Sequence, residues 1–181
     1  MPETFIPTII DVEASGFGSG SYPIEIGVAL PDGQTECFLI RPHTAWRHWD
    51  KAGERAHGIS RQILEKRGKP LNEVAQALNT LLTGKTVYSD AWSFDSSWIA
   101  LLYHQAELPQ LFKIAQLQTL FQELHYELWH PTHEQVRRDL NITRHRASSD
   151  AYLIQQTFIK STLISKGSPS HHTAERSNRS L

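Results

Sequence analysis

The sequence predicts one α/β domain built on a mixed sheet with helices on both of its faces. Three segments with strand character come first, and segments with helical and strand character then alternate, an order typical of this fold class. The chain has 181 residues, enough for a sizeable core in one domain, and its 39% apolar and 20% charged content suits an ordinary globular protein.

The first 41 residues predict an antiparallel meander. Its three strands are expected around residues 6–13, 24–30 and 36–41. The stretch "PDGQ" between the second and third strands is a hairpin signal, because Gly33 can adopt the positive φ that a tight turn requires.

The remainder of the chain predicts helices separated by two further strands. Residues 42–70 are polar and aromatic without a sustained period, which indicates a loop with a short helix after Ser60. The later elements expected are an amphipathic helix over 71–82 closed by Gly84, a strand over 86–90, a helix from Asp95, a strand over 114–117, a helix to about Trp129, a short helix over 132–140 and a long helix over 147–164. Residues 1–165 are therefore expected to form the domain, and the polar residues 166–181 a disordered tail.

Composition narrows the class of protein. Cys37 is the only cysteine, which excludes an intrachain disulfide and a cysteine metal cluster, and its place in the apolar run "ECFLI" predicts a buried structural thiol. No apolar run approaches the roughly 18 residues that span a bilayer, and "MPETFIP" lacks the regions of a signal peptide, so we expect a cytoplasmic protein with no membrane partner. The net charge of -1 argues against a protein that coats long nucleic acid, but it is compatible with an enzyme that grips one strand end.

The stretch "IIDVEAS" places two carboxylates inside a run of β-branched residues. In a strand, Asp11 and Glu13 share one face, while Ile10 and Val12 share the other. Two like charges this close are costly to bury unless basic side chains or a divalent cation compensate them. An edge strand with a solvated polar face would show the same alternation, so these residues alone leave both interpretations open.

Two further acids and a histidine favour a metal site. Asp95 stands where a strand and its loop give way to a helix, and Asp150 stands in the first turn of the last helix, five residues after His145. Each acid alone has an alternative role as a helix cap or dipole partner. If His145 lies in the loop before the helix, it reaches the same pocket as Asp150. Four acids with a nearby proton acceptor then indicate a divalent-metal site suited to phosphodiester hydrolysis.

These residues fall in three blocks that resemble the DEDDh exonucleases, the DnaQ-like group of the ribonuclease H-like superfamily. The blocks are "DVEASG", "FDSSWI" and "HRASSD", with supporting matches at "PIEIGVAL" and "HGIS", and they follow one another in the family's order between Thr8 and Phe158. A histidine five residues before the last acid, rather than a tyrosine four residues before it, is typical of the h branch.

The resemblance implies a ribonuclease H-like fold with a five-stranded mixed sheet. It also implies hydrolysis of single-stranded DNA or RNA from the 3′ end, with release of nucleoside 5′-monophosphates. In this family two Mg²⁺ ions, or Mn²⁺ as a substitute, are bound by four acids, which here would be Asp11, Glu13, Asp95 and Asp150. His145 would deprotonate the attacking water.

The resemblance further suggests where the substrate is held. Backbone groups of Ala14, Ser15 and Gly16 would meet the terminal sugar. His57 of "HGIS" is a further candidate for substrate binding, either by stacking on a base or, in the alternative, as a residue that attaches its loop to the core. Arg144 lies beside His145 in the sequence and is a candidate for phosphate contact. The neighbouring Arg137, Arg138 and Arg146 are candidates for phosphate contact too. A solvated helix face explains Arg137 and Arg138 equally well.

Two features leave the substrate open. Many members carry an asparagine four residues before the second-block acid, whereas this chain has Ala91 there, preceded by Asp90. Asp90 would be either an outer acid of the metal site or a capping or turn residue. In the loop over 42–70, Trp46 and Trp49 would either stack on a base or attach the loop to the core.

The main functional prediction is a metal-dependent 3′-to-5′ exonuclease. One alternative is a nuclease confined to short oligoribonucleotides, which the modest charge would suit. Another is a noncatalytic binding or polymerase-accessory module on the same fold, although a binding module has no reason to keep four mutually repelling carboxylates. A homodimer or a polymerase partner is compatible with the sequence, but nothing in it indicates either.

Overall fold

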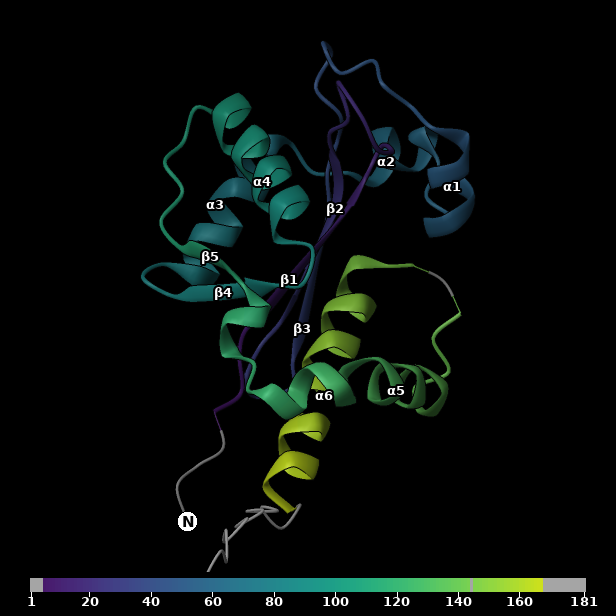
Figure 1. Ribbon diagram of the computed structural model, residues 1–181. Helices are drawn as coiled ribbons and strands as arrows, with labels where there is room; N and C mark the ends of the chain where they lie inside the picture. Colours follow the sequence, from purple (N-terminus) through teal and green to yellow (C-terminus); the bar gives the residue numbers. More distant parts are fainter. Residues whose placement is uncertain (1–4, 144, 168–181) are drawn as a thin grey trace, which may run out of the picture.

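A five-stranded mixed sheet forms the middle layer of the protein in the computed structural model, which describes residues 5–143 and 145–167 (Figure 1). Its strands are β1 (Ile9–Ala14), β2 (Pro23–Ala29), β3 (Thr35–Leu39), β4 (Thr86–Ser89) and β5 (Lys113–Gln116). The strand order is β3-β2-β1-β4-β5, in which β1, β2 and β3 are antiparallel neighbours and β4 and β5 run parallel to β1. The antiparallel meander and the mixed sheet predicted from the sequence are confirmed.

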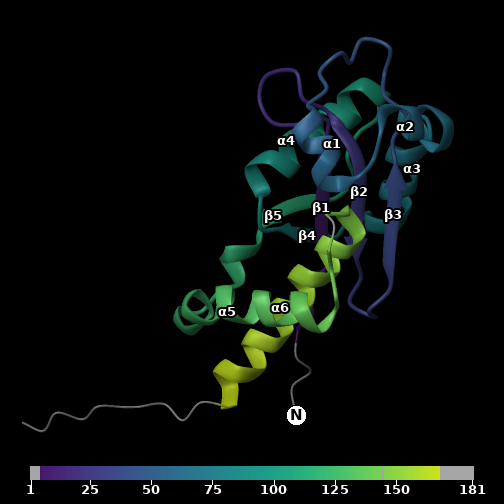
Figure 2. The ribbon, with the colours of Figure 1, turned by 90° about the vertical axis from the view of Figure 1, so that its right-hand side faces the viewer.

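Helices cover both faces of this sheet. They are α1 (Lys51–His57), α2 (Arg61–Arg67), α3 (Leu71–Leu82), α4 (Trp92–Ala106), α5 (Glu123–Asp139), α6 (Ala147–Gly167) and the short 3-10 helix η1 (Leu117–Leu120). Helices α3 and α4 lie together on one side of the sheet, and α6 crosses the opposite side with α5 against it (Figures 1 and 2). None of the helices in the described ranges is long and apolar enough to cross a membrane.

The alternation along β1 assigns its side chains to these two layers. Ile10 and Val12 belong to the core that α3 and α4 complete, whereas Ile9 packs in the core contributed by α6. Because side chains alternate along a strand, the acids that follow Ile9 at every second position face the α6 side. The turn after β2 also forms as predicted, with Gly33 at φ +85° and the Leu30 N–H bonded to the Gln34 carbonyl at 2.8 Å.

Helix α1 lies where the sequence predicted a loop. Asp50 caps its N-terminus by accepting a hydrogen bond from the Ala52 N–H at 2.7 Å, and Gly58 ends it in the left-handed conformation. The helix has only seven residues, so no apolar periodicity can develop along it. Local capping, rather than an amphipathic pattern, therefore defines this element.

Two other helix boundaries differ from the prediction. Helix α4 begins at Trp92, so Asp95 lies within its first turn. Helix α5 is continuous across Pro131, where two helices were expected. Proline removes one backbone donor, and packing of α5 against α6 holds the helix together through that point. Helix α6 continues to Gly167, and the predicted disordered tail lies largely in 168–181, outside the described residues.

The prediction of a buried thiol at Cys37 is wrong. Cys37 is exposed, while its neighbour Phe38 is buried. Strand β3 is an edge strand, so alternate residues of its apolar run face solvent. The Cys37 thiol donates a hydrogen bond to Glu25 on the adjacent strand at 3.2 Å.

Candidate active site

The central strand β1 carries two of the predicted site acids. Asp11 and Glu13 are both partly buried, and β1 is hydrogen-bonded to β2 on one side and to β4 on the other. The alternative of an edge strand with a solvated face therefore does not hold. The pairing of β1 with β2 becomes irregular between Glu13 and Ala14, where the strand ends next to a cavity.

Asp95 reaches the same region from α4. Its side chain is 1% exposed, and one carboxylate oxygen accepts a hydrogen bond of 2.6 Å from the Ser89 hydroxyl at the end of β4. Helix α4 has Ala91 at its N-cap and no side-chain capping bond. A capping role therefore does not explain Asp95.

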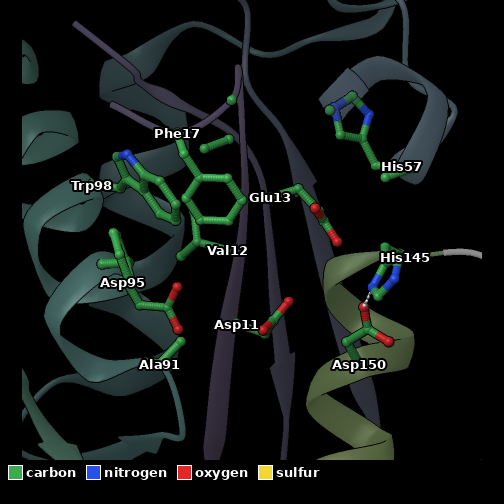
Figure 3. Close-up of a pocket in the computed structure, with 15 residues that line it drawn as sticks. Asp11, Val12, Glu13, Phe17, His57, Ala91, Asp95, Trp98, His145 and Asp150 are labelled. Atoms are coloured by element: carbon green, nitrogen blue, oxygen red, sulfur yellow. Dashed lines mark hydrogen bonds and ion pairs between the residues drawn. The ribbon is translucent and has the colours of Figure 1, made fainter. Parts of the chain in front are cut away.

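Asp150 and His145 come from the start of α6 and the loop before it. His145 Nδ1 lies 3.2 Å from Asp150 Oδ2 (Figure 3). Asp150 Oδ1 is buried and has no hydrogen-bond partner among the described residues. Glu13, His145 and Asp150 each offer a ligand atom within 4.8 Å of the other two, a spacing that allows them to share a metal ion.

One cavity of about 300 Å³ brings these groups together (Figure 3). Strand β1 forms its floor, with α4 on one side and α6 on the other. All five predicted catalytic or metal-binding residues line it: Asp11, Glu13, Asp95, His145 and Asp150.

The carboxylates in this cavity raise one another's proton affinity. Burial raises the pKa of Asp11 well above its usual range, and the charges of Asp95 and Glu13 raise it further. Burial and then the charge of Asp150 raise the pKa of Glu13 to about 7. Burial also raises the pKa of Asp95 to about 7, although the hydrogen bond from Ser89 opposes the shift. The site therefore holds more negative charge than its own residues compensate, and it favours an added cation.

Asp90 adds a fifth acid near this cluster without lining the cavity. Burial raises its pKa, and its charge contributes to the raised pKa of Asp11. Two residues on α5 oppose these upward pKa shifts: the charge of His133 lowers the pKa of Asp90, and the charge of Arg137 lowers the pKa of Asp150. Arg137 Nε is itself buried without a partner among the described residues.

Two of the three backbone positions predicted to meet a sugar line the cavity. Ala14 and Gly16 do so, whereas Ser15 does not. The Ser15 N–H donates to the Tyr22 carbonyl at 2.9 Å, and its carbonyl accepts from the Asp50 N–H at 2.8 Å. A Cβ at Gly16 would lie 2.5 Å from the Asp50 Cβ, so only glycine fits where this loop meets the start of α1.

His57 also lines the cavity, from the end of α1. Its ring is 3% exposed, and Nδ1 accepts a hydrogen bond of 3.0 Å from the Ile59 N–H. Burial lowers the pKa of His57, which favours the neutral imidazole, and because Nδ1 accepts a hydrogen bond the proton of that ring is on Nε2. This Nε2 is buried and has no partner among the described residues, which leaves a free donor at the cavity.

The predicted arginine contacts separate into different roles. Arg144 lies outside the described residues. Arg146 does not line the cavity, because its guanidinium is bonded to Glu25 on β2. Arg138 is exposed and donates to Gln135 within α5 at 3.0 Å.

The tryptophans of the long loop pack against the protein. Trp46 is 8% exposed and stacks on Tyr22 with ring centroids 4.9 Å apart. The Trp49 indole donates to the Glu54 carboxylate at 2.7 Å. Neither lines the cavity, so the attachment alternative describes them.

Three aromatic residues at the cavity were not predicted from the sequence. Phe17, Phe94 and Trp98 line it and contact one another, with Phe17 and Phe94 centroids 5.5 Å apart. Figure 3 shows Phe17 beside Trp98. Phe17 is 71% exposed and Phe94 50% exposed. The signal was their position directly after Gly16 and directly before Asp95, but sequence alone does not show that such rings face solvent.

Comparison with known proteins identifies the fold. No family model matches the sequence, and no curated protein matches it. A zinc-bound complex of E. coli exonuclease I with single-stranded DNA matches with a TM-score of 0.66 at 13% identity, over 91% of this chain and 41% of that one. The ribonuclease H-like fold is confirmed.

Other solved structures of exonuclease I agree with this match. The E. coli enzyme in complex with a dA16 oligonucleotide has a TM-score of 0.66 at 12% identity, over 89% of this chain and 41% of that one. Exonuclease I from Methylocaldum szegediense has a TM-score of 0.64 at 13% identity, over 91% of this chain and 41% of that one. The present chain thus spans about two fifths of the length of these exonucleases.

Proposed function

We propose that this chain is a metal-dependent 3′-to-5′ exonuclease of the DEDDh type that acts on single-stranded nucleic acid. The observation that carries the proposal is the convergence of four acids and one histidine, from β1, α4 and the start of α6, on a single cavity. The shared fold with exonuclease I, which was solved with single-stranded DNA bound, supports the same class of substrate.

The donor set fits a hard divalent cation. Carboxylate oxygens are the ligands that Mg²⁺ and Mn²⁺ prefer, and the buried Asp150 Oδ1 has no protein partner in the described chain. We infer that two such ions are held by Asp11, Glu13, Asp95 and Asp150. When bound, they would supply positive charge to the scissile phosphate.

His145 is the proposed general base. Its ring is half exposed at the cavity and close to Asp150, so it can accept a proton from a water in the cavity. The water oxygen would bond to the phosphorus of the last nucleotide, and the bond from phosphorus to the preceding O3′ would break. The proton is returned to that O3′, which gives a nucleoside 5′-monophosphate and a strand shortened by one residue.

The rim of the cavity suits unpaired bases. Phe17 and Phe94 form an exposed aromatic surface backed by the buried Trp98, and aromatic rings stack on any base that is not already paired. The free Nε2–H of His57 and the backbone beside Gly16 are proposed to contact the terminal sugar. Arg144 remains a sequence-based proposal for phosphate contact.

The direct test uses 5′-labelled and 3′-labelled single-stranded DNA and RNA of several lengths, incubated with the protein and Mg²⁺. A 3′-to-5′ exonuclease releases the 3′ label at once as a mononucleotide and shortens the 5′-labelled strand stepwise. Cleavage of RNA fragments of a few nucleotides alone would instead support the short-oligoribonucleotide alternative. Binding without cleavage under Mg²⁺ or Mn²⁺ would support the noncatalytic alternative and refute the proposal.

A matched pair of variants assigns the activity to the cavity. Asp11→Asn should abolish hydrolysis, because it removes a proposed metal ligand. Asp32→Asn makes the same chemical change in the exposed hairpin turn after β2 and should leave the rate unchanged. Equal rates in both variants would show that the nuclease activity arises elsewhere.

A further inference from the structure

A second buried acid lies directly beside the site without entering it. Glu25 on β2 is paired with Glu13 of β1 in the sheet register, and it is fully buried. A buried carboxylate is costly unless hydrogen bonds and an opposite charge compensate it. Glu25 therefore requires a dedicated set of partners.

The Cys37 thiol on β3 supplies one partner, and the others come from the residues at the start of α6. Arg146 Nε lies 3.0 Å from both carboxylate oxygens of Glu25, and Arg146 Nη2 donates to one of them. The backbone N–H of Ala147 donates to the other oxygen at 3.0 Å. The Glu25 carboxylate thus binds both the Arg146 side chain, 121 positions further along the chain, and the backbone of Ala147, the first residue of α6, 122 positions further along.

Gly27 adds a second point of attachment on the same strand. A Cβ at Gly27 would lie between 2.0 and 2.2 Å from backbone atoms of Ala147 and Ser148. The first turn of α6 therefore rests directly on the backbone of β2. Glu25 fixes this turn by hydrogen bonds, and Gly27 allows it to approach.

His145 is the residue immediately before this attachment. Its own side chain is 54% exposed, and its one hydrogen bond among the described contacts is to Asp150. Its place at the cavity is therefore set mainly by the backbone that leads into α6, and Arg146 is the first fixed point on that side. We propose that the Glu25–Arg146 pair is a positioning device that holds His145 at the cavity, an inference that rests on the proposed exonuclease function.

Arg146 is poorly suited to the alternative role of a substrate contact. Its guanidinium is engaged by a fully buried carboxylate, and it is not among the residues that line the cavity. Lysine could keep the charge but not the two-point contact, because only a guanidinium presents donors in a planar fork. Replacing Arg146 by lysine should therefore lower kcat if Arg146 positions His145, and should raise KM if Arg146 contacts the substrate.

The test is a double-mutant cycle. Arg146→Lys and Arg146→Gln are each made in the wild-type chain and in His145→Ala, and kcat, KM and the Mg²⁺ concentration for half-maximal rate are measured on single-stranded DNA. In the wild-type background, we expect kcat to fall about 10- to 100-fold, with the glutamine variant worse, because a displacement of about 1 Å of a reacting group has this effect. In His145→Ala, the same substitutions should lower kcat less than about 3-fold, since there is no base left to position.

KM and the Mg²⁺ requirement should change less than about 3-fold in the single variants. Arg67→Lys on the exposed last turn of α2 is the matched control and should behave as wild type. If Arg146→Gln does not fold, Arg146→Lys alone completes the cycle, because it keeps a cation beside Glu25.

Each contrary result has a distinct meaning. Equal losses in both backgrounds, or a loss confined to KM or to the Mg²⁺ requirement, would overturn the inference while leaving the nuclease intact. A wild-type chain that hydrolyses no substrate would overturn the proposed function and this inference with it.

Discussion

Because the site acids repel one another, we predict that removing the charge of Glu13 stabilises the folded protein. Burial and Asp150 raise its pKa from 4.5 to about 7, so ionised Glu13 destabilises the folded chain when no metal is bound. Glu13→Gln removes that charge and keeps the size of the side chain. The variant should therefore be more stable than wild type at pH 8 in the absence of divalent ions.

The magnitude follows from the shift. Each pKa unit corresponds to about 1.4 kcal/mol, so a shift from 4.5 to about 7 sets an upper limit of roughly 3 kcal/mol. Glu13 is only partly buried and shares the repulsion with its neighbours, so we expect about 1–2 kcal/mol, or roughly 2–8 °C in melting temperature. Because the folded state binds the Glu13 proton more tightly, the contribution of Glu13 to wild-type stability is most favourable below about pH 4.5 and declines as the pH rises through about 7.

The assay is urea or thermal unfolding of both proteins at pH 5 and pH 8, with and without Mg²⁺. The stability gain of Glu13→Gln should be present at pH 8 and small at pH 5, and Mg²⁺ should stabilise wild type more than the variant. Glu36→Gln, on the exposed face of the edge strand β3, is the control and should show neither effect. A gain that is absent at pH 8, or equal at both pH values, would refute the reasoning.

Three further predictions concern the base, the aromatic rim and the attachment of α6. His145→Ala should lower kcat by about 10²- to 10⁴-fold while Mg²⁺ and single-strand binding stay near wild type, and a normal kcat would remove its role as base. Phe17→Ala should weaken single-strand binding roughly 5- to 150-fold, from about 1–3 kcal/mol per stacked base, in titrations where Phe5→Ala, at an exposed phenylalanine that does not line the cavity, has no effect. Gly27→Ala should lower the free energy of unfolding by about 1–3 kcal/mol or more in urea denaturation, because its Cβ would overlap α6, whereas Gly53→Ala, with its nearest neighbour at 3.6 Å, should change it little.

The fold was predictable where a local pattern matched a local structure. The alternation around Asp11, the turn at Gly33 and the apolar spacing over 71–82 each depend on neighbouring residues, and each element formed as expected. Helix α1 was missed because it depends on its two caps, and Cys37 was placed wrongly because the sequence does not show which strand lies at the edge.

The candidate site divides in the same way. The acids and His145 were selected by motif spacing, and the structure brings them to one cavity. The contact between Glu25 and Arg146 was not predictable, because it joins residues 121 positions apart and neither belongs to a pattern that requires the other. The aromatic rim was missed for a related reason, since exposure depends on the packing of two distant segments around Phe17 and Phe94.

Strand β1 and helix α1, which both line the cavity, differ in their expected local stability. Strand β1 is paired with β2 from Ile9 to Ala14 and with β4 at Ile9, whereas α1, which contributes Gly53, Ala56 and His57 to the cavity, has only two turns and mostly unburied side chains. Segments with few buried contacts open at lower free energy than central strands, so backbone amides over 51–57 should exchange with deuterium far sooner than those over 9–14. Local opening of α1 would therefore widen this side of the cavity while the carboxylates on β1 keep their positions.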